Sequence, residues 1–345
     1  MTGQRGRLLG GAFLAVVLLL FFFRGVDWAA LGTALRDARL LPLVGLVLVT
    51  LGVYAVRAWR WGDLLLPLGR VGFADLFSAT MVGFASGLLI PRAGELVRPW
   101  LISRRHAIPT SAGFATIILE RLVDLITVLV LFALYLFVLP VPQAQVESRL
   151  TELVKLGGAI TGGVAFAVLV FLLALHANAE RVTFAIERLL TRAPRWVAEP
   201  CGRMLRAFSF GLAVLRAPLA QLARIGLESV AVWLLIALGF HLNHAAFGIE
   251  LPFHATFLLM AFLVVGVAIP TPGMVGGFHA FYLLALAEVF GVPRATAVAA
   301  AVAAHALSNL PVLMFGLVFL GREGLSFGKV AEVTREAHEL SEVRP

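Results

Sequence analysis

The sequence predicts an all-α, polytopic helical membrane protein, and its composition and its long apolar segments carry this prediction. The chain has 345 residues, of which 60% are hydrophobic and 14% are charged, and its mean hydropathy is +0.95. A soluble protein carries about 25% charged residues. Apolar segments such as 8–23 and 295–320 are long enough to cross about 30 Å of hydrocarbon as helices.

Apolar segments of two kinds are present: about six that predict full membrane spans, and two that contain breaks. The broken segments cover residues 73–91 and 254–290, and a Gly- and Pro-rich stretch interrupts each. We expect the first to end as a helix at Pro91, and the second to form two helices around residues 270–273. The predicted full spans are 8–24, 40–56, 113–139, 157–175, 227–246 and 295–320.

The N-terminus resembles a signal peptide, because Arg5 and Arg7 precede the apolar run 8–23. The run is long for a signal peptide, and no Ala-x-Ala cleavage pattern follows it. We therefore expect a first span that is retained.

Cysteine and charge counts limit the classes of site that this chain can hold. Its one cysteine, Cys201, allows no disulfide within the chain and no cysteine-based metal site. The 28 Lys and Arg residues exceed the 20 Asp and Glu residues, which gives a net charge of +8. Most of these charges flank apolar segments, so membrane orientation and anionic headgroups explain them better than nucleic acid does. We predict no nucleic-acid partner and no cofactor.

The two breaks are the strongest functional signal, and they cover Phe84–Arg98 and Ala268–His279. Lipid cannot form hydrogen bonds with free backbone groups, so a broken helix at membrane depth survives only inside protein or along a watery cavity. Interrupted segments in corresponding positions of two halves point to the binding site of a transporter.

The distribution of basic residues predicts how the broken segments thread through the membrane. If both are re-entrant hairpins and the N-terminus is cytoplasmic, 21 of the 28 Lys and Arg residues are cytoplasmic, 6 are outside and Arg121 lies within a span. This division obeys the positive-inside rule. We therefore predict two re-entrant broken-helix hairpins that enter from opposite faces, with both termini cytoplasmic, as in a possible inverted repeat.

The predicted domain organisation is a single integral membrane domain over residues 1–345. Within it, residues 177–224 form a long polar connection with apolar residues at helical spacing and arginines between them. This cytoplasmic connector forms either amphipathic helices on the membrane surface or a solvated link that orients the chain. Residues 321–345 are predicted to be a short cytoplasmic tail of mixed charge.

The first break combines helix-breaking residues with cationic ones. Pro91 ends a helix, and Gly94 permits backbone conformations that other residues resist. Arg92, Glu95 and Arg98 are three residues apart, so they share a face if a helix restarts at residue 93. Arginine suits phosphate because its guanidinium donates two parallel hydrogen bonds and stays charged. The alternative is a cytoplasmic loop that only orients the chain.

The third predicted full span contains three ionisable residues, Glu120, Arg121 and Asp124. Each costs about 2.5–3.5 kcal/mol at the centre of a membrane helix, so the three need partners. Glu120 and Asp124 project together, whereas we expect Arg121 to point elsewhere and not to satisfy both. Arg92 or Arg98 is the natural external partner. The group is either a structural ion-pair cluster or part of a substrate site.

The second break offers backbone groups more than side chains. After Pro272, we expect the amides at the start of the following helix to attract an anion. Gly273 and Gly276 would allow close approach of a headgroup. His279 either donates to a phosphate or pairs with a carboxylate, or it is a packing residue.

Two pairs that contain histidine are weaker candidates. His241 and His244 end the fifth predicted span, and His305 and Asn309 share a face of the last one. Histidine pairs can bind a metal ion, but no third ligand follows at a convincing spacing, so no metal site is predicted.

Two arginines and two tryptophans follow the second predicted span, as Arg57, Trp59, Arg60 and Trp61. We interpret them as an anchor of aromatic and cationic residues at the membrane interface, rather than as ligands of a substrate.

Four motifs together are characteristic: Arg57-x-x-Arg60-Trp61, Leu89-Ile-Pro-Arg-Ala-Gly-Glu-x-x-Arg98, Glu120-Arg-x-x-Asp124 and Pro272-Gly-x-x-Gly276. In this combination the chain resembles the flippase-like transmembrane family, which is the family of the lysylphosphatidylglycerol synthase transmembrane region. The resemblance covers residues 40–320, and the second motif is its most specific part.

The resemblance implies a prokaryotic cytoplasmic-membrane protein that handles lipids. In fused synthases this region is associated with moving an aminoacylated phospholipid between leaflets, and other members go with polyisoprenoid-linked sugar pathways. No soluble aminoacyl-transferase domain follows the spans in this sequence, so synthase activity is not expected. Many members have Gly where Met274 stands and Glu where His279 stands, so the second break differs from theirs.

We therefore expect a flippase-like transporter, and not an enzyme, that moves or binds an anionic or amphiphilic lipid. The lipid would be a phospholipid or a polyprenyl-phosphate-linked compound. The predicted substrate-binding residues are Arg92, Gly94, Glu95, Arg98, Glu120, Arg121, Asp124, Pro272, Gly273, Gly276 and His279.

Two alternatives stay open. One is an ion- or proton-coupled carrier of a small solute, with Glu120, Asp124 and His305 as coupling sites. The other is a non-transporting membrane partner of a glycosyltransferase or lipid synthase. The predicted partners are membrane lipids and a lipid-modifying enzyme of this kind.

Overall fold

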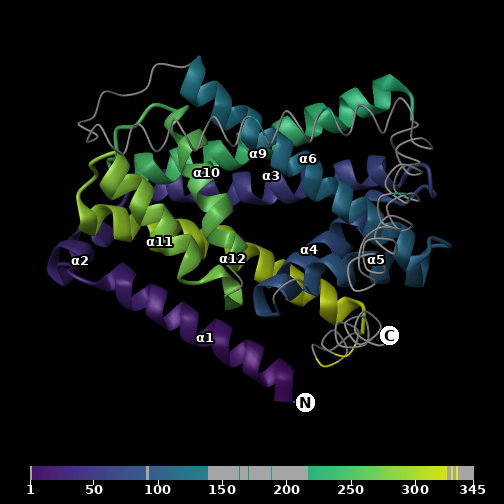
Figure 1. Cartoon of the computed structure of the whole chain (residues 1–345), viewed down its shortest axis with the longest axis horizontal. Helices are drawn as coiled ribbons and strands as arrows, with labels where there is room; N and C mark the ends of the chain where they lie inside the picture. Colours follow the sequence, from purple (N-terminus) through teal and green to yellow (C-terminus); the bar gives the residue numbers. More distant parts are fainter. Residues whose placement is uncertain are drawn as a thin grey trace.

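A computed structural model describes residues 2–90, 93–138, 217–269 and 271–324, together with a few isolated positions beyond these ranges. Every regular element in these ranges is helical, which confirms the all-α prediction for them (Figure 1). In chain order the elements are α1 (Thr2–Phe23), α2 (Trp28–Arg36), α3 (Leu40–Leu65), α4 (Phe73–Leu89), α5 (Ala93–Arg105), α6 (Thr110–Phe137), α9 (Leu219–Ala246), α10 (Ala255–Ala268), the short turn η1 (Pro272–Met274), α11 (Gly277–Leu283), η2 (Leu284–Val289) and α12 (Arg294–Arg322).

Four helical segments of the described ranges are long and apolar enough to cross a membrane, namely α3, α9, α12 and the segment Pro272–Val289. The bent pair α1–α2 would make a fifth. The chain is therefore a multi-pass membrane protein. Predicted spans 40–56, 227–246 and 295–320 lie within α3, α9 and α12. Predicted span 113–139 lies on α6. This helix has 28 residues, but it carries three charged residues and is not one of the four segments named above. Predicted span 157–175 lies outside the described residues except for the isolated positions 163 and 170.

The predicted first span, 8–24, is the first limb of a bent pair. The axes of α1 and α2 meet at 89°. Asp27 begins α2, because its Oδ1 accepts hydrogen bonds from the amides of Ala29 at 2.9 Å and Ala30 at 3.0 Å. Such a cap satisfies amides that the first turn of a helix leaves free, so it fixes the position of the bend.

Polar contacts show which segments meet at one end of the bundle. Arg105 at the end of α5 contacts Asp75 in the first turn of α4, and it donates to Glu323 after α12 at 2.6 Å. Near the start of α9, Gln221 donates to the carbonyl of Asp63 in α3 at 2.9 Å. The open ends of α4 and α5 therefore lie at the end of the bundle where α3 and α12 finish.

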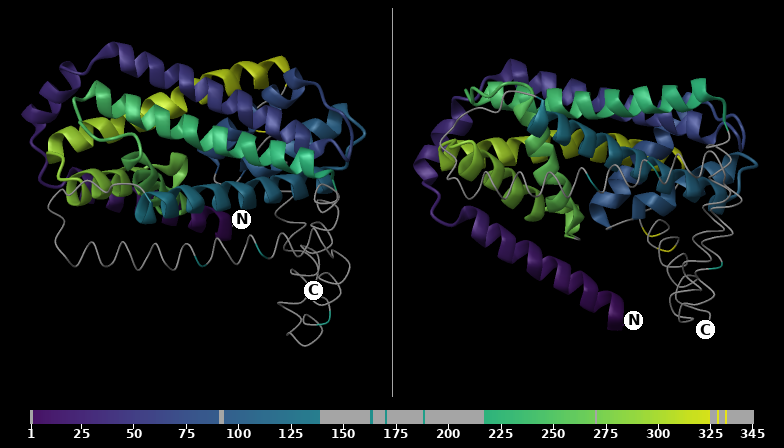
Figure 2. Two further views of the ribbon diagram at one scale, coloured as in Figure 1. Left: turned by 90° about the horizontal axis from the view of Figure 1, so that it is seen from above. Right: turned by 45° about the horizontal axis from the view of Figure 1, so that its top comes forward.

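The opposite end of the bundle holds the start of α3 and the end of α9. The amide of Arg39 donates to the carbonyl of Ala246 at 2.9 Å. α3 and α9 consequently run antiparallel along the whole bundle, side by side in the views of Figure 2. The hairpin of α10 and α11 opens toward this second end (Figure 1).

The first break forms a hairpin whose arms, α4 and α5, cross very closely. A Cβ atom on Gly94 would lie 2.3 Å from the carbonyl oxygen of Gly83, a distance that real side chains do not reach. A helix does restart at Ala93, which was the condition for Glu95 and Arg98 to share a helix face. Gly94 is therefore required for close approach of the two arms.

The second break uses the same device. A Cβ atom on Gly277 in α11 would lie 2.2 Å from the carbonyl oxygen of Gly266 in α10. The helix before the break ends at Ala268 and the next begins at Gly277, close to the predicted boundaries. Both broken segments are thus tight hairpins held together at glycine.

The two hairpins enter the bundle from opposite ends, and their tips meet near its middle (Figures 1 and 2). The turn η1 contacts α4, so the contact joins the two breaks directly. The halves α3–α6 and α9–α12 share one order: a long helix, a broken hairpin and a second long helix. With α3 and α9 antiparallel, this is the arrangement that an inverted repeat produces.

Each hairpin is embedded in its own apolar core. One core gathers α4 and α5 with the end of α3 and the start of α6, around Trp61 and Ile117. The other gathers α10, α11 and η2 with the first half of α12, around Met260 and Tyr282. The tips lie where these two cores meet, so a polar site there would be enclosed by apolar packing.

We predict that Gly94→Ala destabilises the protein while Gly87→Ala does not. A Cβ at residue 94 must displace the backbone of Gly83, whereas one at residue 87 would meet its nearest atom at 3.7 Å, an ordinary contact. Overpacking of this kind costs about 1–3 kcal/mol. Thermal unfolding of both variants in detergent measures the difference. Equal melting temperatures for Gly94→Ala and the wild type would contradict the close crossing.

Candidate functional site

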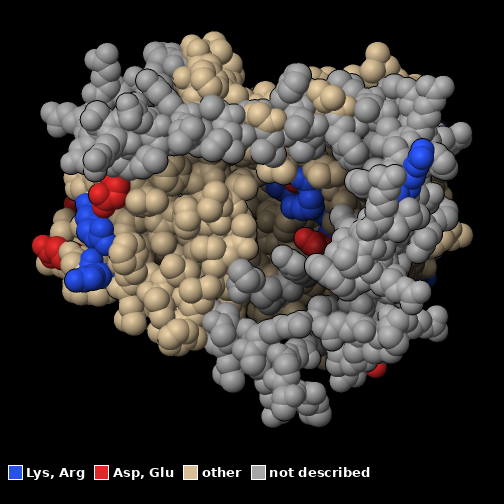
Figure 3. All heavy atoms as spheres, in the orientation of Figure 1, with Lys and Arg blue, Asp and Glu red and all other residues tan. Residues whose placement is uncertain are grey.

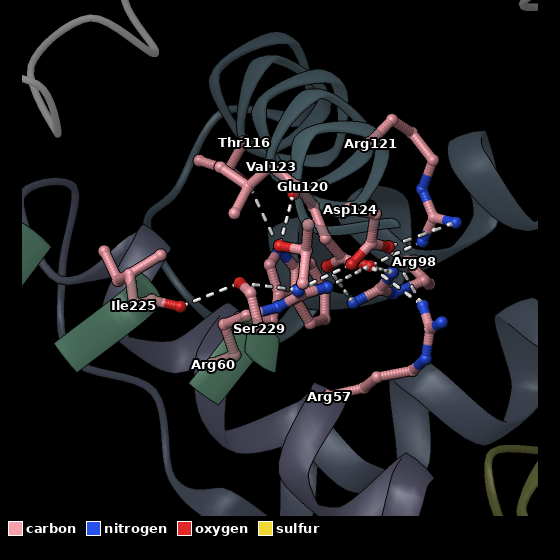
Figure 4. Close-up of polar contacts among 12 residues, drawn as sticks. Arg57, Arg60, Arg98, Thr116, Glu120, Arg121, Val123, Asp124, Ile225 and Ser229 are labelled. Carbon is pink, nitrogen blue, oxygen red and sulfur yellow. Dashed lines mark hydrogen bonds and ion pairs between the residues drawn. The ribbon is translucent and has the colours of Figure 1, made fainter. Parts of the chain in front are cut away.

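Six ionisable side chains from three helices form one group, called the charged cluster here (Figure 4). All of them are buried except Arg121, which is partly exposed. The cluster consists of Arg57 and Arg60 from α3, Arg98 from α5, and Glu120, Arg121 and Asp124 from α6.

Glu120 is the centre of the charged cluster. Nη1 and Nη2 of Arg98 donate to its two carboxylate oxygens at 3.1 and 3.0 Å, in the forked geometry that arginine favours. Arg121 donates to Oε1 of Glu120 at 2.5 Å. Arg60 and Arg57 approach the same oxygen at 3.6 and 3.8 Å. One carboxylate therefore interacts with four arginines, and it joins α3, α5 and α6.

Asp124 extends the charged cluster by one turn along α6. Nη1 of Arg60 lies 2.7 Å from Oδ1 of Asp124, and Nη1 of Arg57 lies 3.3 Å from Oδ2. The indole N–H of Trp233 also donates to Oδ1, at 3.2 Å. Ser229 accepts a further hydrogen bond from Arg60 at 2.8 Å, so α9 joins the network.

Aromatic rings cover the guanidinium groups. Arg98 lies 4.3 Å from the ring centre of Trp61. Phe84 in α4 lies between three arginines, at 5.3 Å from Arg57, 5.5 Å from Arg98 and 5.7 Å from Arg121. Cation–π contacts of this kind stabilise a desolvated guanidinium. The first hairpin therefore contributes both a charge and an aromatic cover.

One sequence prediction for the charged cluster is confirmed and another is wrong. Arg98 is the external partner of Glu120, as predicted. Arg121 does not point elsewhere, because it contacts Glu120 at 2.5 Å and approaches Asp124 at 3.7 Å. The long side chain of Arg121 lies along its own helix and reaches both carboxylates. The prediction considered only the positions of the residues around the helix and not the length of this side chain.

The interpretation of residues 57–61 as an interfacial anchor is wrong for three of its four residues. Arg57 and Arg60 are buried in the charged cluster, and Trp61 is buried with its indole N–H donating to Thr116 at 3.0 Å. Only Trp59, which is 57% exposed, fits an anchor. The physical reason is that α3 continues to residue 65, so these residues lie inside the bundle.

A cavity of about 240 Å³ lies between the two hairpin tips, beside the charged cluster. Figure 3 shows the face seen in Figure 1, hollowed near its centre, with basic and acidic side chains inside the hollow. Residues from both hairpins and the η1 turn line this polar cavity, together with residues from α3, α6 and α12, so it lies between the two breaks. The lining residues that bear charges or polar groups are Tyr54, Glu95, Arg98, Arg121, Thr271 and Asn309.

A second cavity, of about 170 Å³, lies between α3 and α9. Most of its lining is aliphatic or aromatic, and we call it the apolar cavity. Four residues line both cavities, so the two share one wall. These residues are Tyr54, Val267, Met274 and Asn309.

The structure brings four predicted site residues to the polar cavity: Gly94, Glu95, Arg98 and Arg121. Glu120 and Asp124 do not line it, but they hold the arginines that do. The remaining residue of the first break on the predicted list, Arg92, lies outside the described residues, and so do Pro91 and Pro270.

None of the predicted residues of the second break lines the polar cavity. A Cβ on Gly273 would lie 3.7 Å from the carbonyl of Leu88, so this part of the turn, next to Pro272, packs against α4. Gly276 packs against α1. The ring of His279 lies 5.1 Å from that of Phe22.

The amides at the start of α11 do not line the polar cavity either. Gly276 and Gly277 are buried against α1 and α10. The helix that they begin has only seven residues before its geometry changes. The expected anion site at this helix N-terminus is therefore closed by packing, which a single sequence does not reveal.

Most of the shared wall could not be found from the sequence. Tyr54 and Val267 carried no pattern that marks a site, and Met274 stood out only as a difference from other members of the family. Asn309 was considered only as a partner of His305 in a weak metal pair. In the structure, His305 Nε2 lies 2.8 Å from the carbonyl oxygen of Gly273 and holds the turn. Within the described residues, no group of three or more His, Cys, Asp or Glu side chains could hold a metal ion.

Two opposed broken hairpins beside a buried charged cluster define a polytopic membrane protein with an internal polar cavity. The sequence profile of the family described as the lysylphosphatidylglycerol synthase TM region matches residues 7–316, and the chain belongs to this family. The resemblance seen in the motifs is thereby confirmed.

Two relatives show how the chain compares with proteins of this kind. It is 25% identical over 371 residues to the glycosyltransferase AglD of Haloferax volcanii, which covers 98% of this chain but 58% of that protein. The chain thus spans little more than half the length of this relative. It is 24% identical over 321 residues to the UPF0104 membrane protein of Methanothermobacter thermautotrophicus, which covers 89% of this chain and 90% of that one.

We predict that Glu120→Gln strongly destabilises the protein. The substitution leaves buried arginines with one carboxylate fewer, and removing one partner of a buried ion pair costs about 3–5 kcal/mol. Chemical denaturation in detergent, followed by tryptophan fluorescence, measures the change. Glu95→Gln is the matched control, because Glu95 makes no ion pair with any described residue and should change the stability little. Equal effects of the two substitutions would show that Glu120 is not the centre of the cluster.

Proposed function

We propose that this protein is a flippase-like transporter that binds an anionic amphiphilic lipid and moves it between leaflets. The proposal rests chiefly on one observation, that the tips of both broken hairpins and the cationic side chains Arg98 and Arg121 border a single cavity. A transporter binding site at the bilayer midplane is typically built from broken helices of this kind. The proposal contains no catalytic step.

The charge balance favours an anionic headgroup. The charged cluster contains four arginines and two carboxylates, so it retains two positive charges, or one if Glu95 is included. A phosphate at the cavity would meet the guanidinium groups of Arg98 and Arg121. Arginine recognises phosphate well because its donors form a rigid fork that stays charged.

The position of the hollow favours a lipid over a small solute. The hollow in Figure 3 lies on a side of the bundle, between the two ends that the polar contacts define. Helices that cross a membrane present such a side to lipid. A headgroup could then enter the polar cavity while its hydrocarbon tail stays in the bilayer.

Glu95 gives the polar cavity a second chemical character. Its carboxylate lines the cavity together with Arg98 and Arg121. In our proposal it either balances Arg121 or accepts a cationic group of a headgroup that also carries a phosphate. A phospholipid and a polyprenyl-phosphate-linked lipid both carry a phosphate, so both are candidate ligands in this proposal.

We place the protein in the cytoplasmic membrane of a prokaryote, with both termini cytoplasmic. The division of basic residues supports this orientation, because Arg70, Arg104 and Arg105 follow segments that share one end of the bundle. The first hairpin would enter from the cytoplasm and the second from outside. The connector 177–224 lies almost wholly, and the tail 321–345 mostly, outside the described residues.

A second candidate function is that of a membrane partner of a glycosyltransferase. The observation in its favour is the similarity to the relative AglD, a glycosyltransferase that is longer than this chain. In that case the protein would present or hold a lipid-linked substrate without moving it. Purified protein would then bind lipid in the polar cavity but would not exchange it between leaflets.

We predict that Arg121→Ala reduces leaflet exchange of a fluorescent phosphatidylglycerol in reconstituted vesicles. Arg121 lines the cavity and is 41% exposed in its side chain, while Glu120 keeps three other arginines. The variant should therefore fold but bind phosphate less well. Loss of one charged hydrogen-bond partner, worth about 1.5–3 kcal/mol, should slow exchange by roughly tenfold or more.

Arg104→Ala is the matched control for this measurement. Arg104 lies in α5, which packs against the helix α6 that carries Arg121, but it is exposed and stacks on Trp100, 5.0 Å from its ring centre, rather than facing the cavity. Exchange at the wild-type rate in Arg121→Ala, with both variants folded, would reject the site. If Arg104→Ala also abolished exchange while the wild type was active, the loss would reflect removal of any arginine from the protein surface and would not support the cavity as the site.

A further inference from the structure

The turn at the tip of the second hairpin holds a methionine in a backbone conformation that side chains disfavour. The carbonyl of Pro272 accepts a hydrogen bond from the amide of Val275 at 3.1 Å. The two residues between them, Gly273 and Met274, have positive φ angles of 61° and 58°. This is the pattern of a type I′ turn, whose second central residue is usually Gly. Among the described residues, Met274 is the only non-glycine residue with positive φ.

The side chain of His305 in α12 holds this turn in place. His305 Nε2 lies 2.8 Å from the carbonyl oxygen of Gly273, so the ring nitrogen donates to it. Asn309, one helical turn further along α12, donates to the carbonyl of His305 at 2.8 Å. The surrounding structure thus fixes the unfavourable conformation of Met274, as is common where backbone strain has a functional role.

The strained residue lies between the two cavities. Met274 lines the polar cavity and also the apolar cavity, in the wall that it shares with Tyr54, Val267 and Asn309. A turn that only joined α10 to α11 would be relaxed by Gly at this position. The side chain of Met is unbranched and flexible, so it can fill this wall and can also move out of it.

We propose that Met274 is a gate between the polar cavity and the apolar cavity, and that it determines which amphiphiles the site accepts. When Met274 closes the wall, a ligand can occupy only the polar cavity and the hollow beside it. When Met274 is displaced, the apolar part of the ligand can extend into the apolar cavity between α3 and α9. The identity of the ligand rests on the proposed function, but the gate itself does not.

A labelling experiment tests the gate without any lipid substrate. Cys201, the one cysteine of the chain, is replaced by Ser, and Thr50→Cys is introduced as a reporter. Thr50 lines the apolar cavity and is close to cysteine in size. The probe is the thiol reagent 2-sulfonatoethyl methanethiosulfonate, whose negative charge suits the cationic lining of the polar cavity and which cannot cross lipid.

We expect slow labelling of Thr50→Cys in the presence of Met274, and faster labelling in both Met274→Ala and Met274→Gly. An increase of about fivefold or more, the ratio that corresponds to 1 kcal/mol, would support the gate. Thr271→Cys, which lines the polar cavity, should label at the same rate with or without Met274. Melting temperatures show that the variants are folded.

The two substitutions separate the side chain from the backbone. Met274→Ala removes most of the side chain but keeps a Cβ at positive φ, whereas Met274→Gly also relaxes the turn. If only Met274→Gly accelerates labelling, the turn and not the side chain forms the barrier, and the proposal is overturned. Equal labelling of Thr50→Cys in all three proteins overturns it too.

Failure of the gate and failure of the proposed function are distinguishable. If labelling responds to Met274 while Arg121→Ala leaves leaflet exchange unchanged, the gate stands and the lipid site falls. If Arg121→Ala abolishes exchange while labelling ignores Met274, the lipid site stands and the gate falls.

Discussion

The forked ion pair between Arg98 and Glu120 is the interaction on which the rest of the site depends. Both groups are buried inside the helical bundle, where an unpaired charge is very costly. The pair therefore fixes the first hairpin against α6 and sets the position of its tip. Arg57 and Arg60 approach the same carboxylate from α3, so three helices share one electrostatic centre. Because arginines outnumber carboxylates there, this centre is both a structural tie and a source of positive potential.

The geometry of the hairpins converts this tie into a cavity. Each hairpin is closed by a glycine contact, Gly83 with Gly94 and Gly266 with Gly277, so its arms lie too close to admit a side chain or a ligand between them. Space is left only where the two tips approach each other. That space receives Arg98 from the first hairpin, Arg121 from α6 and a strained turn from the second hairpin. The asymmetry suggests a division of roles, in which the first hairpin supplies charge and the second, through Met274, supplies shape.

Much of the architecture could be predicted from the sequence, because local chemistry decides it. Apolar runs and Pro/Gly breaks located the helices and the hairpins, and the need for a buried partner led from Glu120 to Arg98. The rest depends on tertiary packing. The burial of Arg57 and Arg60 follows from the length of α3 inside the bundle, and their motif alone looks like an interfacial anchor. The closure of Gly276 follows from the docking of α1, about which one sequence holds no information.

The most direct test of the central claim, that the cavity between the hairpin tips binds the headgroup of an anionic lipid, is mass spectrometry of lipids that copurify with the protein. The account predicts that an anionic lipid stays bound to the wild type and to Arg104→Ala through delipidating washes, and that Arg121→Ala loses it. The same lipids in the same amounts on all three proteins would show binding at the outer surface only, and would contradict the account.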